Sequence, residues 1–127
     1  MSLSAYEVRT SIAVSDLAKA TDFYEGRLGL SAGEDQADES RIYECGGGTS
    51  LHVYVSPTLA ASATATLATW YVPDLDPVVD ELASKGVTFD RYDDPVLKTN
   101  EKGIHQMADG RVAWFKDPDG NGFAIEE

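Results

Sequence analysis

The chain has 127 residues, of which 43% are hydrophobic, and this length suits one ordinary core; we expect a single domain spanning 1–127. There are 22 acidic against 10 basic residues, giving −12 at pH 7, a balance that excludes nucleic acid and anionic membranes as partners. The lone Cys45 cannot form an internal disulfide, no apolar run approaches the roughly 20 residues that span a bilayer, and the first residues do not resemble a signal peptide. Together these features favour a cytoplasmic protein.

The first half of the chain has the pattern of a strand, a helix and three short strands. Alternation over 8–14 predicts a strand whose Val8, Ile12 and Val14 pack on helices while Arg9 and Ser11 face the other way. The dipeptide Ser15-Asp16 is a typical helix cap, and apolar spacing predicts a helix over 17–28. Strands are then predicted at 30–36, 41–45 and 50–55.

The second half repeats this order after a linker at 56–66. Val72-Pro73-Asp74-Leu75 repeats Val14-Ser15-Asp16-Leu17 in register, and a helix beginning near Pro77 ends at Lys85-Gly86. The matching strands are predicted at 64–72, 87–90, 111–116 and 122–126, with a long loop over 92–107. The sequence therefore predicts two βαβββ modules, at about 5–56 and 64–127.

The last two predicted strands are joined by Asp117-Pro118-Asp119-Gly120-Asn121, whose residue types favour a compact turn and hence a hairpin. This stretch resembles the closing hairpin of the vicinal oxygen chelate superfamily, which includes glyoxalase I, bleomycin resistance proteins and extradiol dioxygenases. The resemblance covers nearly the whole chain. It implies an α+β fold in which two tandem βαβββ modules form curled mixed sheets around a cavity, with helices outside, and it implies a homodimer.

Members of this superfamily commonly hold a divalent metal with four side chains, and the resemblance places the equivalent positions at Arg9, His52, Leu67 and Ala124. Of these residues, His52 alone has an atom that can coordinate a metal. We therefore expect no metal and no other cofactor. The alternative is a displaced set of Glu7, His52 and Glu126, which would support a metal-dependent lyase, isomerase or dioxygenase.

The inward strand faces instead mix aromatic and polar side chains, as small-molecule pockets do. The predicted ligand-binding residues are Arg9, Ser11, His52, Tyr54, Thr69, Tyr71, Trp114 and Glu126. Two structural alternatives stay open: Trp114 could be sheet packing, and Arg9 could form a salt bridge with Glu7, Glu126 or another acidic residue. Trp70, of opposite parity, is interpreted as structural.

These features favour a metal-free protein that binds a small aromatic or cationic molecule. A second hypothesis is a metal-free enzyme, in which Arg9 binds an anionic oxygen and His52, the candidate catalytic residue, acts as a general base. Whether the chain is an enzyme stays open at this stage, because a scaffold alone does not define a reaction.

Overall fold

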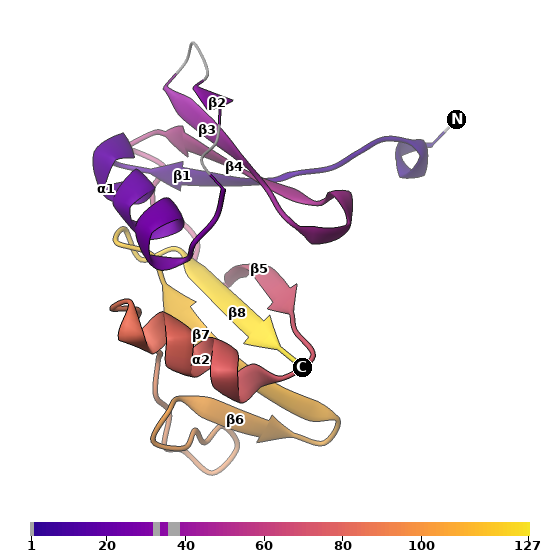
Figure 1. Cartoon of the computed structure of the whole chain (residues 1–127), viewed down its shortest axis with the longest axis vertical. Coiled ribbons are helices and arrows are strands. Elements are labelled where there is room, and N and C mark those ends of the chain that lie inside the picture. The colour runs from indigo at the N-terminus through magenta and orange to yellow at the C-terminus, as the bar shows by residue number, and fades with distance from the viewer. Residues whose placement is uncertain (1, 32–33, 36–38) are drawn as a thin grey trace.

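The computed structural model describes residues 2–31, 34–35 and 39–127 (Figure 1). Its first half contains β1 (Thr10–Val14), α1 (Leu17–Thr21) continued by a π-helical segment (Asp22–Arg27), β2 (Glu34–Asp35), β3 (Ser40–Glu44) and β4 (Ser50–Val55). Its second half contains β5 (Thr66–Tyr71), α2 (Leu75–Ser84), β6 (Ile104–Met107), β7 (Gly110–Lys116) and β8 (Gly122–Glu126). Short 3₁₀ turns lie at Leu3–Ala5 and Gly46–Gly48. The predicted α+β fold with two tandem βαβββ modules is confirmed.

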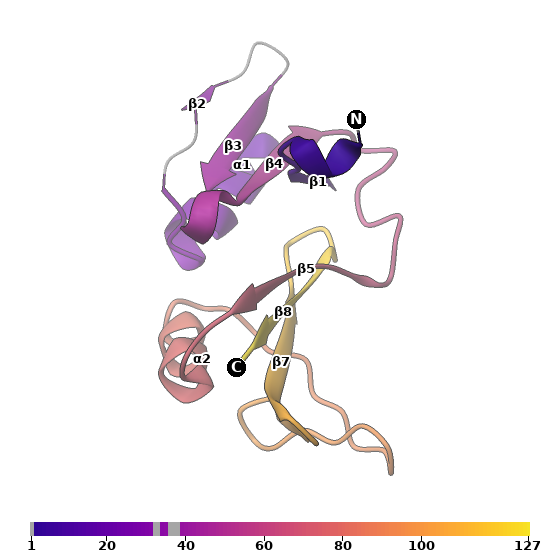
Figure 2. The same ribbon diagram turned by 90° about the vertical axis from the view of Figure 1, so that its right-hand side faces the viewer.

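Each module forms one four-stranded mixed sheet, and Figures 1 and 2 show the two sheets in separate halves of the molecule. The strand order is β1-β4-β3-β2 in the first sheet and β5-β8-β7-β6 in the second. In both sheets the strand before the helix pairs in parallel with the last strand of its module, and the other pairs are antiparallel. No helix in the described part of the chain is long and apolar enough to cross a bilayer.

One strand that the sequence predicted in the second module does not form. The segment 87–90 forms only an isolated bridge between Phe89 and Phe115, and the missing strand is β6, inside the stretch predicted to be a loop. Val87 and Phe89 alternate as they would in a strand because both side chains are buried in the core. Tertiary burial, rather than ladder hydrogen bonds, explains this pattern.

The amino-terminal strand is shorter than predicted. β1 begins at Thr10, and the segment before it projects away from the first sheet (Figure 1), so Val8 is 87% exposed and does not pack on a helix. The strand predicted at 30–36 is present at Glu34–Asp35, whereas 32–33 and 36 lie outside the described residues.

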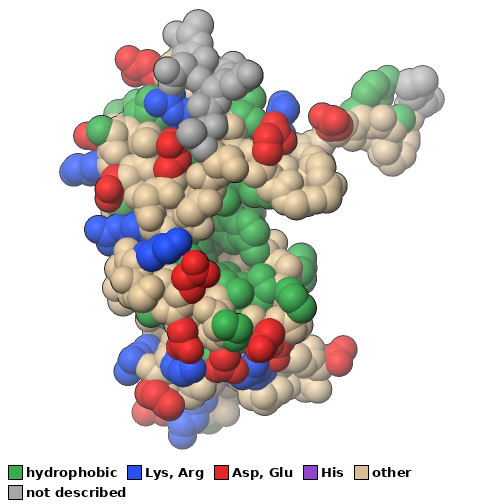
Figure 3. All heavy atoms as spheres, in the orientation of Figure 1, with side chains coloured by type: hydrophobic (Ala, Val, Ile, Leu, Met, Phe, Trp, Pro, Cys, Tyr) green, Lys and Arg blue, Asp and Glu red, His purple; other side chains and the backbone are tan. Residues whose placement is uncertain are grey.

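One hydrophobic cluster extends through both modules. Phe23 and Tyr24, from the helical segment of the first module, lie 6.2 Å from Phe115 and 6.1 Å from Phe123 between ring centroids. Trp70 stacks on Phe115 at 6.2 Å, so its predicted structural role is confirmed. A space-filling view shows hydrophobic side chains gathered at a hollow where the two modules meet (Figure 3).

The predicted hairpin forms, and its turn also joins the two modules. The buried carboxylate of Asp117 accepts hydrogen bonds from the Tyr24 hydroxyl (2.7 Å), the Asn121 side-chain amide (2.8 Å) and the Asn121 backbone amide (2.8 Å). The side chain of Asn121 in turn donates to the carbonyl of Ala13 at 2.9 Å. Asp119 accepts from the backbone amide and hydroxyl of Ser15, at 3.0 and 2.6 Å. We call this set of contacts the turn-to-module bonds.

Candidate functional site

Each sheet packs one side on the hydrophobic cluster, and we call the opposite side its open face. On β1 and β4 the buried Ile12 and Val53 point to the cluster, so Ser11 and its register partner His52 lie on the open face of the first sheet. Tyr54 follows on the same side, and its ring stacks on His52 with centroids 5.7 Å apart. These predicted site residues therefore share one surface.

Arg9 lies just before β1 and is exposed. Its Nε donates to the hydroxyl of Ser50 at 2.9 Å, which holds the guanidinium beside the first open face, two positions along β4 from His52. Among the described residues, Arg9 makes no ion pair, so the salt bridge to Glu7 or Glu126 considered from the sequence is not formed. The charge of this guanidinium stays available to an anion.

The open face of the second sheet carries the other predicted residues in two rows. Thr69, Ala124 and Trp114 are register partners in one row, and Tyr71, Glu126 and Val112 are partners in the next. Tyr71 is 78% exposed, and Trp114 is half-buried. This face therefore combines aromatic surface with one carboxylate.

Two residues that the sequence did not assign to the site flank Trp114. The ring of Tyr92 meets the indole at 5.6 Å and 88°, and the ring of His105 lies at 5.9 Å and 31°. His105 belongs to β6, inside the stretch 92–107 that was predicted to be a loop, and its Nδ1 lies 2.8 Å from the carbonyl oxygen of Lys98. The four residues of β6 gave no clear signal in the sequence, because Ile104 and Gln106 lie on the same side of the strand but one is buried and the other exposed.

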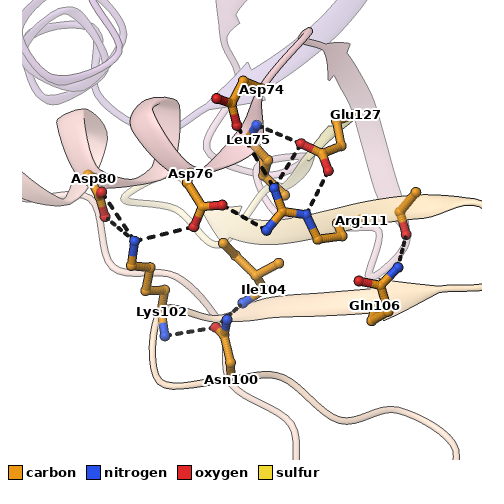
Figure 4. A network of polar contacts seen from close by, with 11 residues as sticks. Asp74, Leu75, Asp76, Asp80, Asn100, Lys102, Ile104, Gln106, Arg111 and Glu127 are labelled. Carbon is orange, nitrogen blue, oxygen red and sulfur yellow. Dashed lines mark hydrogen bonds and ion pairs between the residues drawn. The ribbon is translucent and has the colours of Figure 1, made fainter.

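A network of ion pairs holds the chain that leads into β6 (Figure 4). Lys102 lies 3.3 Å from Asp76 and 3.1 Å from Asp80 on α2, while Arg111 of β7 pairs with Asp76 at 2.7 Å and with Glu127 at 2.6 Å. Glu127 also accepts from the backbone amide of Leu75 at the start of α2, at 2.8 Å. We call these five charged residues the α2 network.

The α2 network lowers the pKa values of Asp76 and Glu127. Hydrogen bonds from Arg111 are the largest cause for both Asp76 and Glu127. The pKa of Lys102 is raised, chiefly by its hydrogen bond to Asp80. Asp76, Glu127 and Lys102 are thus held in their charged forms, and the segment that leads into β6 is tied to helix α2.

A cleft of about 440 Å³ opens between the modules. It is lined by Cys45, Ser50 and neighbouring residues of the first module and by Thr69 and Tyr71 of the second. Burial raises the pKa of the Cys45 thiol, which disfavours the thiolate needed for a nucleophile. The cleft brings two predicted residues next to the Ser50 hydroxyl that binds Arg9.

The structure separates the predicted residues into two groups. Ser11, His52 and Tyr54 belong to the first sheet, with Arg9 just before it, and Thr69, Tyr71, Trp114 and Glu126 belong to the second. In the two views of the ribbon these sheets occupy different halves of one chain (Figures 1 and 2). One chain therefore does not place all eight side chains around a common point.

The displaced metal set is not assembled within one chain. In the part of the chain that the structure describes, no three His, Cys, Asp or Glu side chains are grouped to hold an ion. Glu7 lies in the exposed segment before β1, away from the strand face where it was expected. Leu67 packs against the hydrophobic cluster, because the register shift between Thr66 and Ala68 interrupts the alternation of β5.

Residues 8–125 match the family model of the Glyoxalase/Bleomycin resistance protein/Dioxygenase superfamily, and the chain belongs to this superfamily. No curated protein matches the sequence. Among solved structures, TnmS3, an antibiotic binding protein from Streptomyces sp. CB03234, is 27% identical with a TM-score of 0.71, and the match covers 96% of each chain.

Two further solved structures are similar. A superfamily member from Sphaerobacter thermophilus DSM 20745 is 26% identical with a TM-score of 0.66, and the match covers 96% of each chain. A glyoxalase/bleomycin resistance protein from Catenulispora acidiphila DSM 44928 is 23% identical with a TM-score of 0.69, covering 95% of this chain and 96% of the other. At 23% identity, the likeness to the Catenulispora acidiphila protein supports the fold alone.

Proposed function

We propose that the protein binds a small planar organic molecule on the open face of the second sheet, without a metal ion of its own. The observation that carries this proposal is the half-buried Trp114, flanked by Tyr92 and His105 on a face that also carries Tyr71 and Glu126. Aromatic side chains around an indole provide stacking surface, and the nearby carboxylate favours a ligand with a positive charge. The likeness to an antibiotic binding protein supports the same class of function.

We also propose that two copies of the chain complete the site. The open face with Arg9 and His52 and the open face with Trp114 and Glu126 lie on different sheets, so a ligand enclosed by both needs a second chain. In such a dimer, the first sheet of one copy covers the second sheet of its partner. The guanidinium of Arg9 then contacts an anionic oxygen of the ligand.

Replacing Trp114 tests the ligand site. A thermal-shift screen with planar cationic antibiotics and small aromatic carboxylates selects a ligand whose stabilisation grows with the logarithm of its concentration. We expect Trp114→Leu to weaken this ligand about fivefold or more, since aromatic contacts contribute about 1 kcal/mol, while Trp114→Phe retains part of the affinity. Equal affinities of the wild type and Trp114→Leu would contradict the proposal.

The dimer is tested separately by light scattering after size-exclusion chromatography. We expect a mass near twice the 13.7 kDa of one chain. A monomer that binds the selected ligand with full affinity would contradict the site shared between two copies. The proposal that the ligand binds at Trp114 within one chain would still hold.

The metal-free enzyme remains the second candidate, because Arg9, which has no ion pair with any described residue, is bonded to Ser50, two positions from His52 on β4. Its signature would be turnover of an anionic substrate that His52→Gln abolishes while binding persists. Metal analysis of the purified protein addresses the other alternative. A stoichiometric divalent ion would contradict the metal-free binding proposal.

A further inference from the structure

A second, separate groove lies on the helix side of the second sheet. It has a volume of about 220 Å³, and its walls are Leu28 and Leu30 after the first helix, Trp70 and Val72 from the β5 side, and Val78 and Leu82 on α2. These six wall residues are all half-buried, so each leaves part of its apolar surface to solvent. Hydrophobic side chains are visible at the hollow between the modules (Figure 3).

The floor of this groove is rigid. It consists of Phe115 and Ile125, whose exposed fractions are 1% and 2%. Trp70 is held by two rings of the core, because its ring stacks on Phe115 at an interplanar angle of 21° and lies 5.6 Å from Phe123 between ring centroids. An aromatic wall fixed in this way needs no rearrangement to receive a ligand.

The groove is distinct from the open face used in the proposed function. Neighbouring residues on a strand point to opposite sides, so Trp70 and Phe115 lie behind the second sheet while Thr69 and Trp114 lie in front of it. The sheet therefore separates the groove from Trp114, whereas Trp70, on the edge strand, also lines the cleft that holds Thr69 and Tyr71.

The size and charge of the groove define its occupant. A volume of about 220 Å³ is smaller than the roughly 300–1,000 Å³ of sites for drug-sized molecules, so it fits a body of one to three fused small rings. Glu81 is the one charged lining residue; it is exposed and pairs with Lys85 at 3.5 Å. A ligand ammonium group at this position competes with Lys85 for the Glu81 carboxylate, and the net charge of −12 attracts a cation and repels an organic anion.

We propose that this groove is a second binding site, for a compact hydrophobic amine whose hydrocarbon body contacts Trp70 and whose ammonium group lies beside Glu81. The site is independent of the proposed function on the open face. It is defined by one apolar cavity, one fixed indole and one rim carboxylate.

The test uses a probe pair with one skeleton and opposite charges, adamantan-1-amine and adamantane-1-carboxylate. The chain has two tryptophans, Trp70 and Trp114, so in a Trp114→Phe background the emission reports Trp70 alone. We expect a saturable change of Trp70 emission with the amine and a weaker or absent change with the carboxylate. Light scattering with and without the amine accompanies the titration.

Three variants make the result specific. Val78→Phe fills the groove and is expected to abolish the change; circular dichroism checks that it folds. Glu81→Gln is expected to weaken binding of the amine probe about two- to fivefold, which corresponds to the energy of an exposed ion pair. It is also expected to reduce the preference for the amine probe over the carboxylate probe. Glu101→Gln makes the same charge change on an exposed residue outside the groove and is expected to leave the affinity unaltered.

Three results would overturn the proposal. The first is no saturable emission change in the Trp114→Phe background. The second is equal amine affinity in Glu81→Gln and Glu101→Gln together with no preference over the carboxylate. The third is a change that occurs only when a dimer dissociates, which would assign the groove to a contact between copies.

Discussion

At the scale of single residues, Asp117 stabilises a local turn and also contacts a distant segment of the chain. The sequence predicts a turn from Asp117 to Asn121, and the turn forms. Its carboxylate also accepts a hydrogen bond from Tyr24, which lies 93 positions earlier in the chain. Burial is the largest cause that raises the pKa of Tyr24, followed by the charge and hydrogen bond of Asp117, so the hydroxyl stays protonated and donates.

Tyr24→Phe tests this bond. The substitution keeps the ring in the core but leaves a buried carboxylate oxygen without one of its donors, which costs about 1–3 kcal/mol of unfolding free energy. Urea denaturation followed by circular dichroism measures it. Tyr71→Phe is the control, because its hydroxyl belongs to a side chain that is 78% exposed, and we expect a change within about 0.5 kcal/mol. Equal stabilities of the two variants would show that the bond contributes nothing.

At the scale of elements, the α2 network joins a helix start, β7 and the segment before β6 (Figure 4). The pKa values of Asp76 and Glu127 lie below their ordinary values of 3.8 and 4.5, so the folded protein favours their charged forms. Their contribution to stability is therefore present above those ordinary values and is lost as the pH falls towards the lowered pKa values.

Arg111→Gln removes the centre of this network. We expect its melting temperature to lie below that of the wild type at pH 7, and the difference to shrink as the pH falls below about 4.5, the ordinary pKa of Glu127. Differential scanning calorimetry across this range measures it. Arg91→Gln, which changes an exposed arginine outside the network, should show no such pH dependence. A constant difference between wild type and Arg111→Gln at all pH values would contradict the electrostatic account.

At the scale of the whole molecule, the aromatic contacts between modules predict that 1–127 unfolds as one unit. Phe23 belongs to the first module but contacts Phe115 of the second, and both rings are buried. We expect Phe23→Ala to lower the unfolding free energy by about 3–5 kcal/mol through loss of apolar burial and creation of a cavity. Leu59→Ala, at a residue that is 51% exposed, is the control and should change little.

Two spectroscopic signals distinguish one unit from two. Both tryptophans lie in the second module, whereas far-ultraviolet circular dichroism reports both modules. In the wild type and in Phe23→Ala we expect the two signals to give the same denaturation midpoint. Separate midpoints, or tryptophan emission that is insensitive to Phe23→Ala, would mean that the modules unfold independently.

Local patterns in the sequence were sufficient for the order of elements in the first module, the Asp16 helix cap, the closing hairpin and the side of the sheet on which Trp70 lies. These features depend on neighbours a few positions apart, where periodicity and turn chemistry act. Tertiary structure decided which residues flank Trp114, the place of β6, the absence of an ion pair at Arg9 among the described residues and the separation of the eight site residues on two sheets. Those features depend on contacts between distant segments, whose geometry is set when two curved sheets and their helices pack together.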